Sequence, residues 1–524
     1  MAQAGPDHPP PCRPSHAMFA IVLFGVAAAL SLCEASPPVP NEPSPGCALT
    51  PAASANANYE AIMGCLASPA RTARLQGGVF LLPKGIQLLP GSHILGNATD
   101  PSEFARLQIE TPTSMSSFVL ETSTNSSVGF LTLDGARNLV GSGCCVSVIK
   151  VSGNSSRVHD VELLNVEGGT GVHFVDKYAR GNHFLRVHVH DCFYGVIFTH
   201  GLDAERRNVF EDGTIEGVAC DAIVFAGYGE AIRNTVRNTG YNCGGDPPNP
   251  GGGLYCRGNI VGGLIVENVV HDTCGMALDF DSCAHFNVSF NTFRSPGNTF
   301  SGQYPFCGGM ATATLLDSHN MRLEGNVVSN DLSSNVQSNA ILQDPNHVFR
   351  DIETAAFSDL PGGADTVLNF VIAQRPWTAA RPSVSNEVIG NVFSSSCNAT
   401  AGSCLGVGYY SGRGTGLHGP SECYELHGLD RCEWRPSRYI ANNVTGSDVG
   451  SRRCGRNWYS SDVLCPVGAA APCNEDDSEH RVETYRNDLN CSRYAHHFPW
   501  SEAHGGLGQL RVALPLETER NARA

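Results

Sequence analysis

The feature that most constrains this chain is a repeat with a period of roughly 26 residues, the length of one short structural unit. Strand-like segments led by an asparagine start at Asn182, Asn208, Asn234 and Asn259, so their spacing is nearly constant. A unit of this length is too short to bury a core alone, so successive units must stack on one another. The repeat therefore predicts a solenoid in which each unit forms one coil and all coils share one interior.

A second short strand recurs within the units and indicates which side chains face the interior. Successive side chains of a strand point to opposite faces, so an alternating apolar pattern marks the buried face. The residues predicted to face inward are Val172, Phe174, Val196, Phe198, Ile223, Phe225, Met276 and Leu278. Strands stacked at about 4.8 Å per coil bury such residues, and the repeated asparagines fit a stack of turns that satisfies backbone groups along the coil axis.

The strand-rich part of the chain opens with two apolar segments punctuated by Gly and Pro, residues 77–85 (GGVFLLPKG) and 88–96 (LLPGSHILG). These segments resemble the N-terminal coil of the pectin-lyase-like superfamily. Together with the repeats, the resemblance covers roughly residues 75–490 and implies an all-β fold, a right-handed parallel β-helix. It transfers no catalytic residue, because the W-x-D-H, G-H-G, R-I-K and D-P-H-[DE] signatures of lyases, polygalacturonases and alginate epimerases are absent from the coils.

These patterns divide the chain into five predicted segments. They are a signal peptide (1–35), a Pro-rich linker with an N-terminal cap (36–74), the parallel β-helix (75–396), the last coils with Cys-rich, disulfide-stapled loops and a cap (397–491), and a C-terminal tail (492–524). The β-helix segment carries the repeats and therefore the candidate functional residues.

Several features favour a secreted protein. The apolar run 19–32 has the length of a signal-peptide core and is shorter than the roughly 20 residues that a membrane helix needs. We predict cleavage near Ala35, with an uncleaved N-terminal anchor as the alternative. Seven Asn-x-Ser/Thr sequons and 21 cysteines are typical of a disulfide-bonded glycoprotein. We predict a monomer without stable membrane insertion.

The charge of the chain limits its partners. The formal net charge is −16, which disfavours a general electrostatic attraction to nucleic acid. The stretch 177–207 is the exception, because its five basic residues outnumber its three acidic ones. We predict that these residues hold an anionic polysaccharide, the alternative being an ordinary solvated basic face. They are Lys177, Arg180, Arg186, Arg206 and Arg207.

The same stretch contains candidate catalytic residues. In the run VHVHD, inward-facing valines would place His188 toward solvent, while His190 and Asp191 begin a turn. Elimination or epimerisation on a uronic acid needs a neutralised carboxylate and a base such as histidine. We predict that His188, His190 and Asp191 are catalytic. The His-Asp dipeptide recurs at 159–160 and 271–272, which favours a role in turns instead.

A second candidate is the run ALDFD, which carries Asp279 and Asp281. With the apolar residues buried, both carboxylates would project from one strand face about 7 Å apart. That spacing lies within the roughly 6.5–9.5 Å of an inverting glycoside hydrolase. The alternatives are a turn role for Asp281 and a Ca²⁺ site, since calcium prefers clustered oxygen ligands. The sequence predicts no other cofactor.

These features lead to two hypotheses about function. The first is a secreted carbohydrate-active protein that acts on an extracellular polysaccharide, one that could contain uronic acid, by lyase or glycoside hydrolase chemistry. The second is a non-catalytic cell-wall or extracellular-matrix protein that binds polysaccharide or mediates adhesion. The seven sequons and the missing catalytic signatures favour the second hypothesis.

Overall fold

The structure is a computed structural model, and the described residues belong to one compact unit that starts at Ser44. It describes residues 46–111, 117–137, 139, 146–176, 179–199, 207–243, 251–294, 311–316, 318, 320–331, 366–374, 386–396, 403–411, 437–440, 442–445 and 482–485. The predicted signal peptide and C-terminal tail lie outside these residues, as do residues 36–45 of the linker segment and most of the Cys-rich segment. None of the helices in the described part of the chain combines the length and apolar character of a membrane span.

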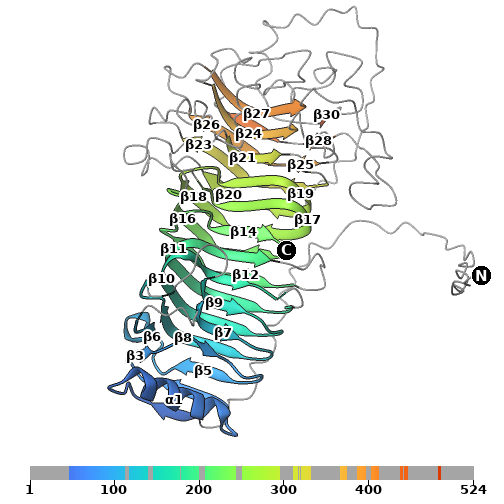
Figure 1. Ribbon diagram of the computed structural model, residues 1–524. Helices are drawn as coiled ribbons and strands as arrows, with labels where there is room; N and C mark the ends of the chain where they lie inside the picture. Colours follow the sequence, from blue (N-terminus) through green and yellow to red (C-terminus); the bar gives the residue numbers. More distant parts are fainter. Residues whose placement is uncertain are drawn as a thin grey trace, which may run out of the picture. The chain divides into compact units, whose positions relative to one another are not determined.

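The strands pair in parallel and form three ladders that run along the stack of coils (Figure 1). Ladder 1 starts at β1, and one strand from each successive coil pairs with the strand before it. Its strands are β1 (Cys47–Leu49), β2 (Thr72–Leu75), β5 (His93–Gly96), β8 (Ser127–Asp134), β10 (Arg157–Phe174), β11 (His183–Thr199), β12 (Val209–Glu211), β15 (Glu230–Ile232), β17 (Leu254–Val266), β19 (Leu278–Ser289), β22 (Arg322–Glu324), β25 (Glu387–Ile389), β28 (Ser437–Ile440) and β30 (Val482–Tyr485).

Ladders 2 and 3 share the long strands β8, β10, β11, β17 or β19 with ladder 1, because those strands pass round a corner of the coil. Ladder 2 adds β3 (Gly78–Leu82), β6 (Ala105–Ile109), β13 (Thr214–Glu216), β16 (Thr235–Thr239), β18 (Val269–Thr273), β20 (Thr292–Arg294), β23 (Val327–Asp331), β26 (Val392–Ser396) and β29 (Asn443–Thr445). Ladder 3 adds β4 (Ile86–Gln87), β7 (Phe118–Thr122), β9 (Ser147–Val151), β14 (Ile223–Ala226), β21 (Ala311–Leu316), β24 (Thr366–Gln374) and β27 (Ser403–Ser411).

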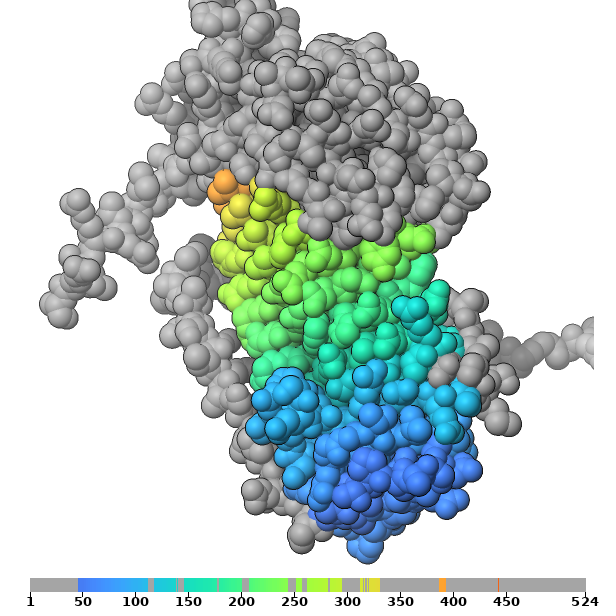
Figure 2. Space-filling model, turned by 90° about the vertical axis from the view of Figure 1, so that its left-hand side faces the viewer, coloured from blue at the N-terminus to red at the C-terminus, as the bar shows by residue number. Residues whose placement is uncertain are grey.

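This arrangement is a right-handed parallel β-helix, which confirms the predicted fold class. The colours of Figure 2 follow one another along the stack, so coils that are neighbours in sequence are neighbours in space. A side chain therefore meets residues about one coil earlier or later in the chain, and this spacing governs every contact described below.

A short helix closes the N-terminal end of the stack. Helix α1 (Ala55–Ala67) begins at Ser54, whose hydroxyl accepts a hydrogen bond from the Ala57 backbone N–H at 3.2 Å. Ile62 and Leu66 on its inner side are fully buried against the core. A disulfide between Cys47 and Cys65 ties the helix to β1. The short 3-10 helix η1 (Pro101–Glu103) precedes β6.

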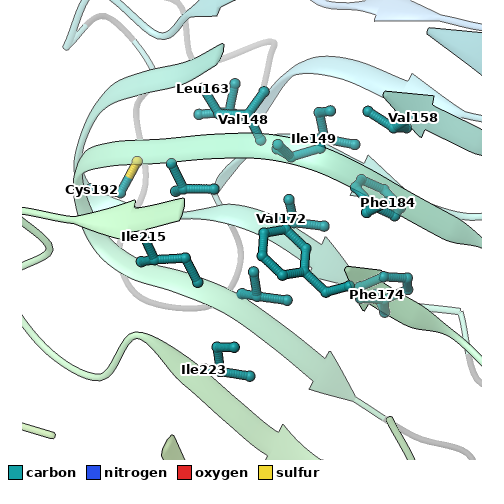
Figure 3. Close-up of a cluster of buried hydrophobic side chains, with 14 of the residues drawn as sticks. Val148, Ile149, Val158, Leu163, Val172, Phe174, Phe184, Cys192, Ile215 and Ile223 are labelled. Carbon is teal, nitrogen blue, oxygen red and sulfur yellow. The ribbon is translucent and has the colours of Figure 1, made fainter. Parts of the chain in front are cut away.

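The interior is a continuous apolar column, part of which is drawn in Figure 3, and it contains the predicted inward-facing residues except Met276. All eight of those residues are buried, Met276 the least at 9%. The register differs in the last unit, because Ile223 pairs with Leu254, and Leu254 with Leu278. Leu278 therefore occupies the place predicted for Met276. The sequence pattern aligned the unit of Ile223 directly with the unit of Met276, but the coil that contains Leu254 lies between them.

Stacked asparagines satisfy the backbone at two corners, which confirms the turn role predicted for them. The Asn182 side-chain N–H donates to the Asn208 carbonyl at 2.9 Å at the entry to ladder 1. A longer column enters ladder 2, and each member donates to the next at 2.9–3.0 Å. That column consists of Asn234, Asn268, Asn291, Asn326, Asn391 and Asn442.

The predicted phase of the asparagine repeat is wrong at Asn234. Asn208 precedes Val209, which pairs with Glu230 in the next coil. Asn234 instead precedes Thr235, which pairs with Thr214 in ladder 2. Because coils differ in length, equal spacing in the sequence placed these asparagines at different corners. The side chain of Asn259 lies outside the described residues.

Candidate functional site

Strand β11 carries His188 and His190 on the outward face of ladder 2. The side chains of Val187 and Val189 are fully buried in the core, so the strand alternation turns the two imidazoles outward. Both imidazoles are partly exposed. The ring centroids lie 4.8 Å apart, so the imidazoles are direct neighbours. This arrangement agrees with the orientation that the sequence predicted for His188.

A carboxylate from the coil on either side contacts this pair. Glu162 on β10 is in register with His188, and Glu216 on β13 is in register with His190. The hydrogen bonds run diagonally: His190 Nε2 lies 3.2 Å from Glu162 Oε1, and His188 Nε2 lies 3.0 Å from Glu216 Oε1. Each imidazole is therefore held by a carboxylate on a different strand.

Further polar groups hold these four side chains in place. Asp191 Oδ2 lies 2.7 Å from His190 Nδ1. The Thr132 hydroxyl donates to Glu162 Oε2 at 2.9 Å, and Arg237 Nε donates to Glu216 Oε2 at 2.6 Å. The result is a row of polar side chains across five successive coils, linked by hydrogen bonds between neighbouring coils. We call this row the polar track; it comprises Thr132, Glu162, His188, His190, Asp191, Glu216 and Arg237.

The contacts in the polar track shift the pKa values of three of its side chains. The hydrogen bond from His190 to Glu162 raises the pKa of His190, against the effect of burial and with support from Asp191. The same bond from His190 lowers the pKa of Glu162. Burial works against ionisation of Glu216, yet the bonds to Arg237 and His188 leave its pKa lowered. The track therefore favours a proton on His190 beside ionised carboxylates.

Sequence reasoning missed Glu162 and Glu216, although the repeat could have found them. Glu162 lies one repeat before His188 in the sequence, and Glu216 lies one repeat after His190. A search for polar residues one coil before and after each histidine would have identified both. Inspection of the immediate chain neighbours could not, because the contacts are made between coils.

The His-Asp dipeptides have a common geometry, as the turn hypothesis expected. In each, the Asp carboxylate lies 2.7–2.9 Å from the Nδ1 of the preceding histidine. Each aspartate has a positive φ, 53° for Asp160, 52° for Asp191 and 53° for Asp272. Within the described part of the chain, His190 is the one of these three histidines that also contacts a carboxylate from the preceding coil.

The described part of the chain contains three of the five predicted basic residues, Arg180, Arg186 and Arg207. Arg186 lies at the corner between ladders 1 and 2 and donates two hydrogen bonds to Asp160, at 2.7 and 2.8 Å. Arg207 precedes β12 and donates to Glu230 at 2.8 Å. Arg180 is exposed, while Lys177 and Arg206 lie outside the described residues. The carboxylates that pair with Arg186 and Arg207 come from neighbouring coils, so substrate binding by these arginines stays a prediction.

The paired-aspartate hypothesis stays a prediction as well. Asp279 lies on the outward side of β19, between the buried Leu278 and Phe280, but it is only 6% exposed. The side chain of Asp281 lies outside the described residues, so the separation of the two carboxylates is undefined. The Ca²⁺ alternative at these residues stays a prediction for the same reason.

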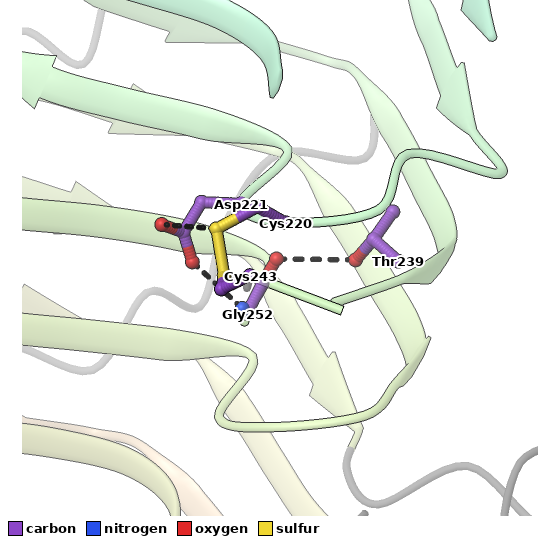
Figure 4. The surroundings of a disulfide bond; sticks show 5 residues. All are labelled: Cys220, Asp221, Thr239, Cys243 and Gly252. Carbon is purple, nitrogen blue, oxygen red and sulfur yellow. Dashed lines mark hydrogen bonds between the residues drawn. A yellow bond between two sulfur atoms is a disulfide. The ribbon is translucent and has the colours of Figure 1, made fainter. Parts of the chain in front are cut away.

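Another group of potential metal ligands, Cys220, Asp221 and Cys243, is accounted for by a disulfide (Figure 4). The two sulfurs are bonded to each other and therefore are not thiolate ligands. Asp221 Oδ1 accepts a hydrogen bond from the Gly252 backbone N–H at 2.7 Å. Burial raises the pKa of Asp221 to about 6, against the effect of that bond.

The pKa of Asp221 gives a pH-dependent prediction. Because it is raised in the fold, the carboxyl favours folding below its unfolded pKa of 3.8, and this stability is lost as pH rises through about 6. Asp221→Asn should therefore stabilise the protein by about 2 kcal/mol near pH 8 and by almost nothing near pH 4. The side chain keeps some solvent contact, so we expect less than the roughly 3 kcal/mol of a fully buried carboxyl.

Urea unfolding of the wild type and Asp221→Asn at both pH values measures this effect. Asp272→Asn, which removes a carboxylate from a more exposed turn, is the control and should show no comparable gain near pH 8. Equal stabilisation by Asp221→Asn at both pH values would contradict the assignment.

Comparison with known proteins gives no close relative. No protein-family model matches the chain, and no curated protein matches it. Solved structures do match, at 11–12% sequence identity and with TM-scores below 0.5.

Three of these structures are described as carbohydrate-active. The mannuronan C-5 epimerase AlgE6 A-module of Azotobacter vinelandii is 12% identical over 75% of this chain and 89% of its own, with a TM-score of 0.42. A mannuronic acid specific polysaccharide family 6 lyase from human gut microbiota is 11% identical over 76% and 80%, with a TM-score of 0.38. The catalytic domain of a GH87 alpha-1,3-glucanase is 11% identical over 78% and 66%, also with a TM-score of 0.38. No residue role is taken from them.

Proposed function

We propose that this protein is a carbohydrate-active β-helix protein that acts on an extracellular polysaccharide at the polar track. The single observation that carries the proposal is the imidazole pair His188 and His190, which faces outward between carboxylates of adjacent coils. A row of polar groups that crosses several coils suits a polymer laid along the stack. The disulfides support an extracellular location, because they persist in oxidising compartments.

The chemistry that best suits this pair is β-elimination on a uronic acid. His188 donates through Nε2 to Glu216, so its other ring nitrogen is available to accept the C5 proton of the sugar. As that proton leaves, the C4–C5 double bond forms and the C4–O4 bond breaks. His190 then donates its proton to the departing O4. Glu216 stabilises the imidazolium formed on His188. Arg237 donates to Glu216 through Nε, and in this proposal its terminal N–H groups help to neutralise the sugar carboxylate.

A second candidate is non-catalytic polysaccharide binding. It is favoured by the ion pairs of the arginines near the track, since Arg186 and Arg237 are already bound to carboxylates. Such a surface would catalyse no reaction and would bind a polymer through hydrogen bonds to the hydroxyl groups of the sugars. Under this alternative the histidines affect retention on the polymer and nothing else.

Incubation of the secreted protein with a panel of polysaccharides tests the proposal. Unsaturated uronates report elimination, new reducing ends without unsaturation report hydrolysis, and inversion at C5 reports epimerisation. His188→Ala should lower the rate of elimination by about 10²-fold or more while polymer retention persists. His159→Ala is a matched control, because His159 has the same bond to the following aspartate but lies outside the track.

The outcomes separate the two candidates. Unsaturated products that are lost in His188→Ala and kept in His159→Ala support the proposal. Retention without any product from any polymer supports the binding protein and rejects the enzyme. Products that persist unchanged in His188→Ala place the chemistry elsewhere on the molecule.

A further inference from the structure

The contact between His190 and Glu162 requires a positive charge between the two side chains. Asp191 accepts at 2.7 Å from His190 Nδ1, which keeps one proton on that nitrogen. The opposite nitrogen, Nε2, then turns a lone pair toward Glu162 Oε1 at 3.2 Å. A lone pair and a carboxylate oxygen repel each other at this distance, so the contact needs either a second proton on Nε2 or a metal ion bound to both atoms.

We infer that Glu162, His188 and His190 form a binding site for a divalent transition-metal ion of the zinc type. One ligand atom from each of the three side chains lies within 4.8 Å of the other two. One edge of this group, 3.2 Å between His190 Nε2 and Glu162 Oε1, matches an edge of a zinc tetrahedron. That edge is roughly 3.3 Å for ligand distances of about 2.0–2.1 Å.

The surrounding residues provide the outer support that metal ligands need. A metal-bound histidine usually donates its remaining N–H to a carboxylate, which fixes the ring and its tautomer. Asp191 accepts that bond from His190, and Glu216 accepts it from His188. The Thr132 hydroxyl donates to Glu162 Oε2 at 2.9 Å, which leaves Oε1 to face the ion.

The ligand set also determines which ions fit. Two imidazoles and one carboxylate suit Zn²⁺ and related transition metals, whereas Ca²⁺ and Mg²⁺ prefer oxygen ligands alone. Three protein ligands on a partly exposed face leave the fourth position open to water or to a ligand. Because β10 and β11 are rigidly paired, the ligand backbones are already in place and only side-chain rotations are needed.

The site uses the same imidazole nitrogens as the proposed elimination, so a bound ion and that chemistry exclude each other at these histidines. Metal binding is measured without any polysaccharide, so it can fail or succeed separately from the proposed function. The chelator-treated full chain is titrated calorimetrically with ZnCl₂ alone and, separately, with CaCl₂. We expect the wild type to bind one more equivalent of Zn²⁺ than the double variant His188→Ala/His190→Ala. Asp191→Asn should keep the equivalent but weaken its affinity about 10–100-fold, since it removes outer support for His190.

Two controls keep the result interpretable. His271→Ala removes another outward imidazole bonded to a following aspartate and should leave the extra equivalent unchanged. Thermal unfolding of each variant without metal establishes that the β-helix remains folded. Equal uptake of Zn²⁺ by the wild type and the double variant would overturn the inference and leave a proton between His190 and Glu162. Tighter binding of Ca²⁺ than of Zn²⁺ would overturn it as well.

Discussion

Asn268→Ala should destabilise the protein by about 3–5 kcal/mol, since it leaves several buried polar groups without partners. Asn268 is fully buried in the middle of the asparagine column. Its side chain donates to the carbonyl of Ala231 and to the Asn291 side chain, both at 2.9 Å. The side-chain oxygen of Asn268, Oδ1, accepts from the backbone and side-chain N–H groups of Asn234 at 2.9 Å. Alanine removes all of these partners at once.

Chemical denaturation of Asn268→Ala and of a matched variant measures this cost. Asn320→Gly is the control, because Asn320 is exposed and has a φ of 53° that glycine adopts without strain. We expect the control to change stability by less than about 1 kcal/mol. A similar small change for Asn268→Ala would mean that the column contributes little to stability.

Phe198→Ala should have an effect of similar size for a different reason. The Phe198 ring is buried and stacks between Phe174 at 4.8 Å and Phe225 at 5.4 Å, measured between ring centroids. A Cβ atom added at Gly229 would lie 2.4 Å from this ring, so the backbone of Gly229 packs closely against the Phe198 ring. Truncation leaves a cavity that three rigid coils cannot close, and the expected loss is about 3–5 kcal/mol.

The chain offers a direct control for this substitution. Phe290 is 60% exposed, so Phe290→Ala removes the same side chain without leaving a cavity. Its free energy of unfolding should differ from that of the wild type by less than about 1 kcal/mol. If Phe198→Ala and Phe290→Ala proved equally stable, the aromatic stack would not be a tightly packed part of the core.

The fold could be predicted because local pattern and global architecture agree in a solenoid. Alternation within each strand assigned Phe174, Phe198 and Phe225 to the interior, and the core contains all three. The phase of the repeat could not be predicted with the same accuracy. Coil lengths vary, so Asn234 lies at a different corner from Asn208, and Leu254 occupies a coil that the pattern did not register.

The candidate site could be predicted only in part. Alternation was enough to turn His188 outward, since Val187 and Val189 had to be buried. The carboxylates that form hydrogen bonds with the two histidines come from other coils. Glu162 and Glu216 were therefore missed. For the same reason the sequence assigned no metal-binding role to the histidines, because one ligand of the proposed zinc site lies a full coil away in sequence.

The sequence by itself determined the coil, its apolar interior and the outward direction of His188, because these depend on the repeat and on alternation within one strand. The local excess of basic residues in 177–207 is also a property of the sequence, but the stacked coils place carboxylates beside two of these residues. Arg186 is paired with Asp160, and Arg207 with Glu230. Only the tertiary structure decided these partners, since stacking brings side chains one coil apart in the sequence into contact while chain neighbours alternate between opposite faces.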